Sequence, residues 1–329
     1  MSKPRLGFLG TGWIGRSRMK AIVATGMVEA AAIVEPDANC AAEALKLAPA
    51  ARLLPSYEAL LTERLDGIII ATPSALHASQ SVAALESGAA VFCQKPLGRD
   101  AEEVRAVVDA ARRSDRLLGV DLSYRHTAAV RAIADTLEAG LLGEVFAVDL
   151  TFHNAYGPDK PWFYDRQLSG GGCVIDLGVH LVDLALWLLG FPPVERVHSS
   201  LFAKGQRLTA GAEAVEDYAT ATLDLATGAV VRLACSWHLD AGQDAVIEAA
   251  FHGTEASAVL RNVNGSFYDF NMRLKRGTDS EVLAAPPDQW SGRAAAAWAR
   301  QLPVSNRFDE AAAQNVKVAE VLDRIYSGS

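Results

Sequence analysis

The residues of this sequence that could do chemistry begin with a glycine-rich run near the N-terminus. Gly10-Thr11-Gly12-Trp13-Ile14-Gly15 follows an apolar segment that we expect to be a strand and opens one that we expect to be a helix. Glycines at this spacing permit a tight turn and a close approach of the backbone to a pyrophosphate, which the N–H groups at the helix start bind. Glu35 lies twenty positions beyond Gly15, where a carboxylate can accept hydrogen bonds from a ribose and repel a 2′-phosphate. The run therefore predicts a dinucleotide site that prefers NAD to NADP, formed by Gly10, Gly12, Trp13, Ile14, Gly15 and Glu35.

A second group of polar residues forms a stripe on an otherwise apolar expected helix, Cys173–Leu189. Asp176, His180 and Asp183 stand at i, i+4 and i+7, within about 60° of one another around a helix of 3.6 residues per turn. A buried helix has no reason to carry a carboxylate and an imidazole unless they pair with each other or face a cleft. Both interpretations stay open on spacing alone, and we assign Asp183 a structural role. We expect no metal, because no third His or Cys lies at a spacing that indicates zinc.

A third group is Gln94-Lys95-Pro96, which ends the fifth expected strand. Open α/β sheets bind their ligands at this carboxyl edge. A lysine there can be a solvated charge, or a cis peptide bond before Pro96 can aim Lys95 back toward a cleft.

The segments that must position these groups alternate, in the first third of the chain, between short aliphatic runs and longer Ala-rich helical patterns. This alternation is typical of βαβ units that build a parallel sheet. The expected strands are Leu6–Leu9, Glu29–Val34, Gly67–Ala71, Ala89–Cys93 and Leu117–Val120. The expected helices are Ile14–Ala24, Ala38–Lys46, Tyr57–Leu61, Ala75–Ser87 and Asp100–Arg113.

Beyond Asp121 the pattern changes. We expect helices at Ala128–Ala139 and about Phe308–Tyr326, a strand at Val145–His153, and a Pro/Gly/aromatic loop from 154 to 172 before the Cys173–Leu189 helix. Later strands alternate apolar and polar residues, as in Val231–Leu239, which favours a largely antiparallel open sheet without crossovers. The fold class is therefore α/β: a doubly wound Rossmann domain at residues 1–121, followed by a substrate-binding and oligomerisation α+β domain at 122–329.

Composition limits the partners and the location. Of the 329 residues, 50% are hydrophobic and 21% charged, which indicates a globular protein. The net charge of −8, with no basic patch, argues against nucleic acid and anionic membranes. No signal-peptide or membrane-spanning pattern appears, so we expect a cytoplasmic protein. The four cysteines form no Cys-x-x-Cys pair, and we expect them to be reduced and mostly in the core.

Three motifs in order resemble those of the Gfo/Idh/MocA family, the glucose-fructose oxidoreductase and inositol dehydrogenase group. They are Gly10 to Gly15, Gln94-Lys95-Pro96, and Gly170-Gly171-Gly172 leading into Asp176-Leu177-Gly178-Val179-His180. The resemblance runs from about Leu6 to the last helix. It implies nicotinamide-dependent oxidation of a secondary alcohol, or the reverse, on a sugar, cyclitol or related polyol. One departure is Gln94, where the family often has Glu.

The resemblance also implies catalytic roles. His180 would be the general base in oxidation and the acid in reduction, since an imidazole titrates near neutral pH. Lys95 would donate a hydrogen bond to the reacting oxygen and stabilise its negative charge. Asp176 would orient the imidazole or bind a neighbouring hydroxyl.

Further positions surround these three. Thr72, Pro73, His77 and Gln94 are expected to line the cofactor crevice, although His77 could instead face solvent from its helix. Tyr124, Arg125, Trp162 and Asp165 are expected to contact substrate, with Trp162 stacking on the C–H face of a sugar.

Two other functions stay open. The chain could be a non-catalytic NAD-binding sensor or regulator, or an enzyme whose tightly held NAD oxidises its substrate transiently during elimination or glycosidic cleavage.

Whatever the function, we expect the second domain's sheet to have an uncovered apolar face that pairs in a homodimer or homotetramer.

Overall fold

The computed structural model describes residues 3–209 and 212–328, and these divide into two compact units. Unit 1 comprises Met1–Ser123 and Ser291–Val316, and unit 2 comprises Tyr124–Trp290 and Lys317–Ser329. The chain thus leaves unit 1, builds most of unit 2 and returns to unit 1 near its end. The expected domains of 1–121 and 122–329 did not include this return.

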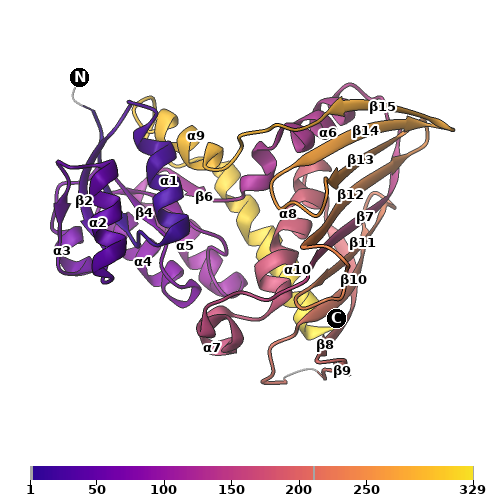
Figure 1. Cartoon of the computed structure of the whole chain (residues 1–329), viewed down its shortest axis with the longest axis horizontal. Coiled ribbons are helices and arrows are strands. Elements are labelled where there is room, and N and C mark those ends of the chain that lie inside the picture. Colours follow the sequence, from indigo (N-terminus) through magenta and orange to yellow (C-terminus); the bar gives the residue numbers. More distant parts are fainter. Residues whose placement is uncertain (1–2, 210–211, 329) are drawn as a thin grey trace. The chain divides into compact units, whose positions relative to one another are not determined.

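Unit 1 has the doubly wound architecture that the sequence predicts. In the part of the chain that the structure describes, its sheet has six strands in the order β3-β2-β1-β4-β5-β6, all parallel, with helices along both faces (Figure 1). The strands are β1 (Arg5–Leu9), β2 (Glu29–Val34), β3 (Arg52–Leu53), β4 (Gly67–Ile70), β5 (Ala90–Cys93) and β6 (Leu118–Val120). The helices are α1 (Trp13–Val23), α2 (Ala38–Leu47), α3 (Tyr57–Leu61), α4 (Ser74–Glu86) and α5 (Ala101–Ser114). Each expected element is confirmed to within one residue at either end.

The returning segment adds α9 (Arg293–Gln301), a helix that is not among those the sequence predicts. Its Trp298 is buried and its ring lies 5.8 Å from that of Phe92 on β5. The indole also covers Gly67 and Gly119, where an added Cβ would lie 2.7 Å from its ring atoms. Two glycines in neighbouring parts of the sheet therefore make room for one large side chain that closes the core of unit 1.

Unit 2 contains a sheet of nine strands among the described residues, in the order β15-β14-β13-β12-β7-β11-β10-β8-β9. The strands are β7 (Val145–Asn154), β8 (Val194–Ala203), β9 (Gln206–Arg207), β10 (Tyr218–Leu225), β11 (Val230–Ser236), β12 (Ala245–Gly253), β13 (Ser257–Asn262), β14 (Phe270–Arg276) and β15 (Asp279–Ala284). The helices include α6 (Ala128–Glu138), α7 (Arg166–Ser169), a π-turn (Val174–Gly178), α8 (Val179–Leu188) and all but the first three residues of α10 (Gln314–Ser327). Helix α10 follows a short 3₁₀ turn, Glu310–Ala313, whereas the sequence predicts a single helix from about Phe308.

The sheet is largely antiparallel, as the sequence predicts, but the expected absence of crossovers is wrong. Most strands pair antiparallel, but β7 and β11 run parallel, with Val230 opposite Ala147 and Ser236 opposite His153. A parallel pair needs a crossover connection, so crossovers are present. The alternating pattern of a strand tells which residues share a face, and carries no information about the direction of its neighbour.

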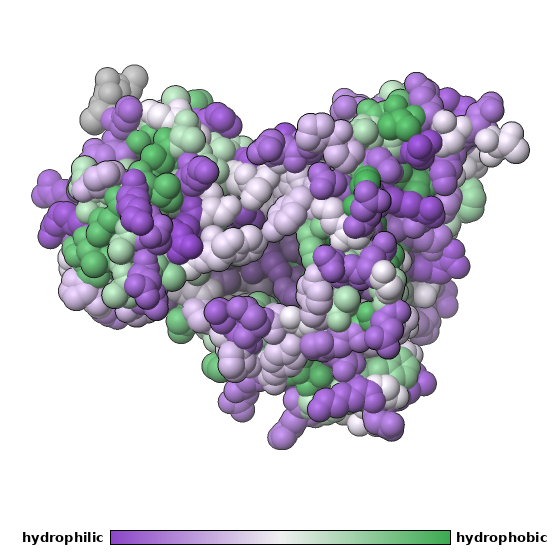
Figure 2. All heavy atoms as spheres, viewed as in Figure 1, coloured by the Kyte–Doolittle hydropathy of each residue, from purple (hydrophilic) through white to green (hydrophobic). Residues whose placement is uncertain are grey.

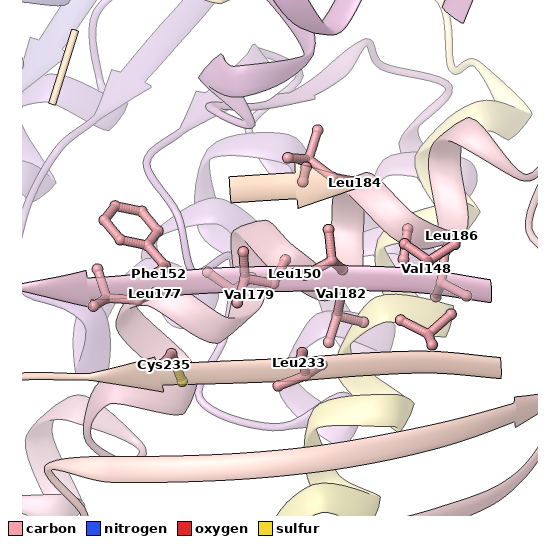
Figure 3. Packing of buried hydrophobic residues seen from close by; sticks show 14 of the residues in the cluster. Val148, Leu150, Phe152, Leu177, Val179, Val182, Leu184, Leu186, Leu233 and Cys235 are labelled. Carbon is pink, nitrogen blue, oxygen red and sulfur yellow. The ribbon is translucent and has the colours of Figure 1, made fainter. Parts of the chain in front are cut away.

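The core of unit 2 lies between this sheet and its helices (Figure 3). Phe152 on β7, Cys235 on β11, and Leu177 and Val182 on the helical segment belong to this core, and all four are at most 5% exposed. The segment Arg166–Leu188 is long and apolar enough to cross a membrane, but 83% of its most apolar window is buried, as in a core helix. The alternation expected in β11 is confirmed by its buried inner residues Val231, Leu233 and Cys235.

The opposite face of the sheet is not the apolar surface that we expected. Ion pairs join neighbouring strands there: Arg232 Nε lies 2.6 Å from Asp149 Oδ1, and Arg261 Nε lies 2.7 Å from Glu248 Oε2. A similar mixture of hydrophilic and hydrophobic residues covers the side of unit 2 seen in Figure 2. The outward positions of these strands also carry hydroxyl side chains, such as Thr151 on β7 and Thr222 on β10, so this face is polar as well as apolar.

We predict that Gly119→Ala lowers the free energy of unfolding by about 1–3 kcal/mol, because the added methyl group overpacks the pocket around Trp298. Urea unfolding followed by circular dichroism measures the change. In a Trp298→Phe background, where the smaller ring leaves room for the methyl group, the same substitution should cost less. An equal loss in both backgrounds would contradict this packing.

Candidate functional site

The glycine-rich loop between β1 and α1 has the geometry of an anion site. Gly10 has a φ of +81°, and an added Cβ would lie 2.6 Å from the Ala71 carbonyl oxygen, so only glycine fits. An added Cβ at Gly15 would overlap the Gly10 carbonyl, whereas the space around Gly12 holds no atom within 4 Å. Gly12 is also the N-cap of α1 and offers no capping side chain, so the N–H groups of the first turn suit a diphosphate. Trp13, beside them, is 66% exposed.

Glu35, just after β2, is oriented toward this loop. Its Oε2 accepts a hydrogen bond from Thr11 N at 2.5 Å, and its Oε1 accepts one from Asp37 N at 3.0 Å. A negative charge therefore lies beside the glycine loop, as an interaction with a ribose hydroxyl requires. Gly10, Gly12, Gly15 and Glu35 together fit a dinucleotide without a 2′-phosphate.

His77, on α4, connects the loops that follow β4 and β5. Its Nδ1 lies 2.6 Å from the carbonyl oxygen of Pro96, and its Nε2 lies 2.7 Å from that of Thr72. The side chain is 2% exposed, so the solvent-facing alternative is wrong. Burial lowers the pKa of His77, while the two carbonyl groups raise it. Its position holds the loops of Thr72-Pro73 and Lys95-Pro96 in register.

Lys95 lies two residues beyond the end of β5 and is half-buried. The peptide bond between Lys95 and Pro96 is cis, which is one of the two alternatives that the sequence leaves open. The lysine therefore stands at the carboxyl end of a parallel strand, beside the loop that His77 binds.

Gln94 belongs to a buried polar network that the sequence does not predict. Its Nε2 donates to Asp121 Oδ2 at 2.6 Å, and Arg18 Nε donates to the same oxygen at 2.5 Å. Ser123 Oγ donates to the other carboxylate oxygen of Asp121 and accepts from Arg18 Nη2 at 3.1 Å. Gln94 thus acts as a donor to a carboxylate, which explains physically why an amide suits this position better than a second carboxylate. A buried arginine on α1 is the signal that could have indicated the network.

The stripe of unit 2 lies on a helix that begins irregularly. We call Val174–Leu188 the site helix; its first five residues form the π-turn and the rest is α8. A π-turn inserts one residue into the helical repeat and occurs often at functional sites. Asp176 lies within this π-turn. The uninterrupted α-helix that the sequence predicts therefore gives the wrong angular position of Asp176 relative to His180.

Asp176 and His180 are each held by neighbours in unit 2. Asp176 Oδ2 accepts a hydrogen bond from Trp237 Nε1 at 3.1 Å. His180 is 8% exposed, and its ring centroid lies 4.8 Å from that of Tyr124 in an edge-on arrangement. The imidazole is therefore enclosed and fixed in orientation, as a general acid or base requires.

Asp183 forms an ion pair with Arg125. Its Oδ2 accepts from Arg125 Nε at 2.9 Å and its Oδ1 from Nη2 at 2.5 Å. Burial raises the pKa of Asp183, and the guanidinium opposes that rise. The guanidinium also lies over the rings of Trp187 and Phe191. Arg125 is thus part of the packing of the site helix, which supports the structural role of Asp183, and its contact with substrate stays a prediction.

Trp162 and Asp165 lie in the loop before the glycine triplet. The ring of Trp162 stacks on that of Phe163, with centroids 3.8 Å apart, and Asp165 caps α7 by accepting from Gln167 N at 2.9 Å. Their substrate contacts stay predictions. Among residues 3–209 and 212–328, no group of three His, Cys, Asp or Glu could hold a metal ion.

Comparisons with known proteins give a match for each of the two units. A family model described as "Oxidoreductase family, NAD-binding Rossmann fold" matches residues 5–122, and one described as "GFO/IDH/MocA C-terminal domain" matches residues 130–259. The chain is similar to D-glucoside 3-dehydrogenase of Escherichia coli, with 29% identity over 61% of this chain and 60% of the relative. It is similar to 1,5-anhydro-D-fructose reductase of Ensifer adhaerens, with 34% identity over 60% of this chain and 57% of the relative. These two matches span less than two thirds of the relatives' length.

A longer match is to the putative UDP-kanosamine synthase oxidoreductase subunit of Amycolatopsis mediterranei, with 30% identity over 78% of this chain and 75% of the relative. Among solved structures, levoglucosan dehydrogenase in complex with NADH and levoglucosan has a TM-score of 0.82 at 22% identity, covering 98% of this chain and 96% of the other. The 3-ketoreductase KijD10 from Actinomadura kijaniata, in complex with NADP and TDP-benzene, has a TM-score of 0.84 at 22% identity, covering 99% and 98%. These structures share the fold.

We predict that Gln94→Glu destabilises the protein by about 1–3 kcal/mol at neutral pH, because it sets a second carboxylate against Asp121 with one guanidinium between them. The loss should shrink as the pH falls and the two carboxyl groups share a proton. Urea unfolding at pH 8 and pH 5 measures both effects.

Gln80→Glu is the matched control for this substitution. The side-chain oxygen of Gln80 accepts from Thr72 Oγ1 at 2.6 Å, so a carboxylate there keeps its donor and should change stability little. Equal effects of the two substitutions would refute the donor role of Gln94.

Proposed function

Because the chain belongs to the GFO/IDH/MocA oxidoreductase family, we propose that it is an NAD-dependent dehydrogenase or reductase acting on a sugar, cyclitol or related polyol. Unit 1 is an NAD-binding Rossmann fold. Relatives named for glucosides, anhydrofructose and inositol support a polyhydroxylated substrate. The reaction we propose transfers hydride between the nicotinamide and a secondary alcohol or its ketone.

The observation that carries the proposal is where the three motif side chains stand. Lys95 lies just beyond the carboxyl end of a parallel strand of the NAD-binding unit, and Asp176 and His180 are fixed on the buried site helix of unit 2. Burying an imidazole and a carboxylate on an otherwise apolar helix costs free energy, which a functional role of Asp176 and His180 would justify.

The dinucleotide would be held by groups whose geometry is described above. The loop from Gly10 to Gly15 would bind the diphosphate through backbone N–H groups, and Glu35 would bind the adenosine ribose. When bound, NAD supplies the carbon that accepts or donates the hydride. We propose NAD over NADP because the Glu35 carboxylate, oriented by Thr11, would repel a 2′-phosphate.

The protein's own groups would manage the proton and the charge. In oxidation, an imidazole nitrogen of His180 would remove the substrate's hydroxyl proton, and in reduction it would return that proton. The Lys95 ammonium would donate a hydrogen bond to the same oxygen and stabilise the negative charge that develops there. Asp176, held by the Trp237 indole, would orient the imidazole or bind an adjacent hydroxyl.

The comparisons also bear on the two alternative functions. The matches do not favour a non-catalytic sensor or an elimination enzyme. A cytoplasmic location, a homodimer or homotetramer through the sheet of unit 2, and the absence of nucleic acid and membrane partners stay predictions.

We predict that His180→Ala and Lys95→Ala each lower kcat by roughly 10²-fold or more, the usual scale for a positioned proton-transfer group. The assay follows reduced nicotinamide absorbance with a panel of sugars, sugar acids and inositols. NAD affinity, measured by calorimetry, should be largely kept. His198→Ala, at an exposed position of β8, is the control and should turn over normally. Normal turnover by both site variants would show the assignment to be wrong.

We also predict that Glu35→Gln narrows the preference for NAD over NADP by about tenfold, since the amide removes the charge that repels a 2′-phosphate. The amide oxygen can still accept from Thr11 N, so the loop should keep its shape. Dissociation constants for both dinucleotides check this. A preference that does not change would mean that another group discriminates between them.

A further inference from the structure

The start of the site helix is held by a carboxylate from a distant part of the chain. We propose that Glu216, together with Tyr326, is a positioning residue that fixes the backbone carrying Asp176 and His180. Glu216 stands just before β10, and Tyr326 lies near the end of α10. The inference rests on the proposed function, because positioning matters only if those two side chains act on the substrate.

The two residues satisfy four successive backbone N–H groups. Glu216 Oε1 accepts from Gly172 N and from Val174 N, both at 2.9 Å, and the Glu216 carbonyl oxygen accepts from Cys173 N at 3.1 Å. The Tyr326 hydroxyl accepts from Ile175 N at 3.2 Å and donates to Glu216 Oε1 at 2.8 Å. These are the N–H groups that a helix start leaves without partners in the helix itself.

The same contacts explain why glycines occupy two positions of the triplet Gly170-Gly171-Gly172. A Cβ on Gly171 would overlap the Tyr326 hydroxyl, and one on Gly172 would overlap the Glu216 carbonyl oxygen. Glycines at these positions therefore let the two partners reach the backbone. The triplet belongs to the anchor of the site helix, which lies immediately before Asp176 in the chain.

Burial and charge make this anchor rigid. Glu216 is 2% exposed, and a carboxylate there is stabilised by three hydrogen bonds to one oxygen and by the positive end of the helix. Burial raises the pKa of Glu216, and the two backbone N–H groups and the Tyr326 hydroxyl oppose the rise. Moving the helix start would leave this carboxylate without partners in the interior, at a large energetic cost.

The anchor and the Asp176 side chain are linked through the strands. Asp217, the residue after Glu216, accepts a hydrogen bond from Trp237 N at its carbonyl oxygen, 2.7 Å away. The indole of Trp237 donates to Asp176. One short segment of chain therefore holds the π-turn from its N-terminal end and, through Trp237, supports the Asp176 carboxylate. Glu216 acts through these neighbours.

The test compares Glu216→Ala, Glu216→Gln and Tyr326→Phe in the full-length chain. Glu216→Ala should lower kcat by about 10- to 100-fold, because small misplacements of catalytic groups cost this much, with little change in NAD affinity. Glu216→Gln keeps an acceptor oxygen and should restore kcat to within a few-fold of wild type. Tyr326→Phe removes one acceptor and one donor and should lower kcat about tenfold.

A second readout follows Asp176 directly. Exchange of the Trp237 indole proton, observed by NMR, should be faster in Glu216→Ala and Tyr326→Phe because its acceptor is less well held. The control is Asp269→Ala, which removes a carboxylate of unit 2 that binds Ser266 Oγ at 2.9 Å in the turn before β14. The control should keep both kcat and the indole exchange rate, even if its melting temperature falls.

The outcomes separate this inference from the proposed function. If Glu216→Ala, or Tyr326→Phe should the former fail to fold, loses melting temperature but keeps kcat and indole exchange, Glu216 is merely structural and the inference is overturned. If His180→Ala and Lys95→Ala are themselves fully active, the proposed function fails instead. Reduced kcat with faster indole exchange, together with recovery in Glu216→Gln, supports positioning.

Discussion

An apolar helix buried inside a domain cannot keep polar groups unless each finds a partner there, and the structure of unit 2 follows from that constraint. The backbone N–H groups at the start of the site helix bind Glu216 and Tyr326, Asp176 binds the Trp237 indole, and Asp183 binds Arg125. These partners come from the residues just before β10 and just after β11, from α10 and from the segment before α6. The central helix thereby joins elements far apart in the sequence, and its polar groups are held in defined positions because their partners are.

Unit 1 uses a similar arrangement at the ends of its strands. Asp121, after β6, receives hydrogen bonds from Gln94 after β5 and from Arg18 on α1, while His77 connects the loops after β4 and β5. The motif residues Gln94 and Pro96 are thus hydrogen-bonded to buried side chains, Asp121 and His77, that belong to none of the three motifs. The Gln94 amide illustrates this dependence, because its suitability follows from the Asp121 carboxylate opposite it.

Local patterns were sufficient to predict the βαβ units, the glycine loop and the site helix, because unbroken apolar runs and helical periodicity express burial directly. They could not show β3, which has two exposed residues, or α9, whose single large apolar side chain fills a pocket in a distant sheet. They also could not show the π-turn, since an inserted residue leaves no mark in composition. Arg18 and Asp121, like Gly172 and Glu216, are linked across long sequence separations that no local window spans.

The late return of the chain to unit 1 has a consequence for biosynthesis. The first 123 residues emerge from the ribosome well before Trp298 is synthesised. The nascent nucleotide-binding sheet therefore has an uncovered surface around Phe92, Gly67 and Gly119. Its apolar pocket closes only when the segment from Ser291 follows. The unit that is translated first is therefore completed almost last, and during elongation it presents a hydrophobic surface of the kind that chaperones bind.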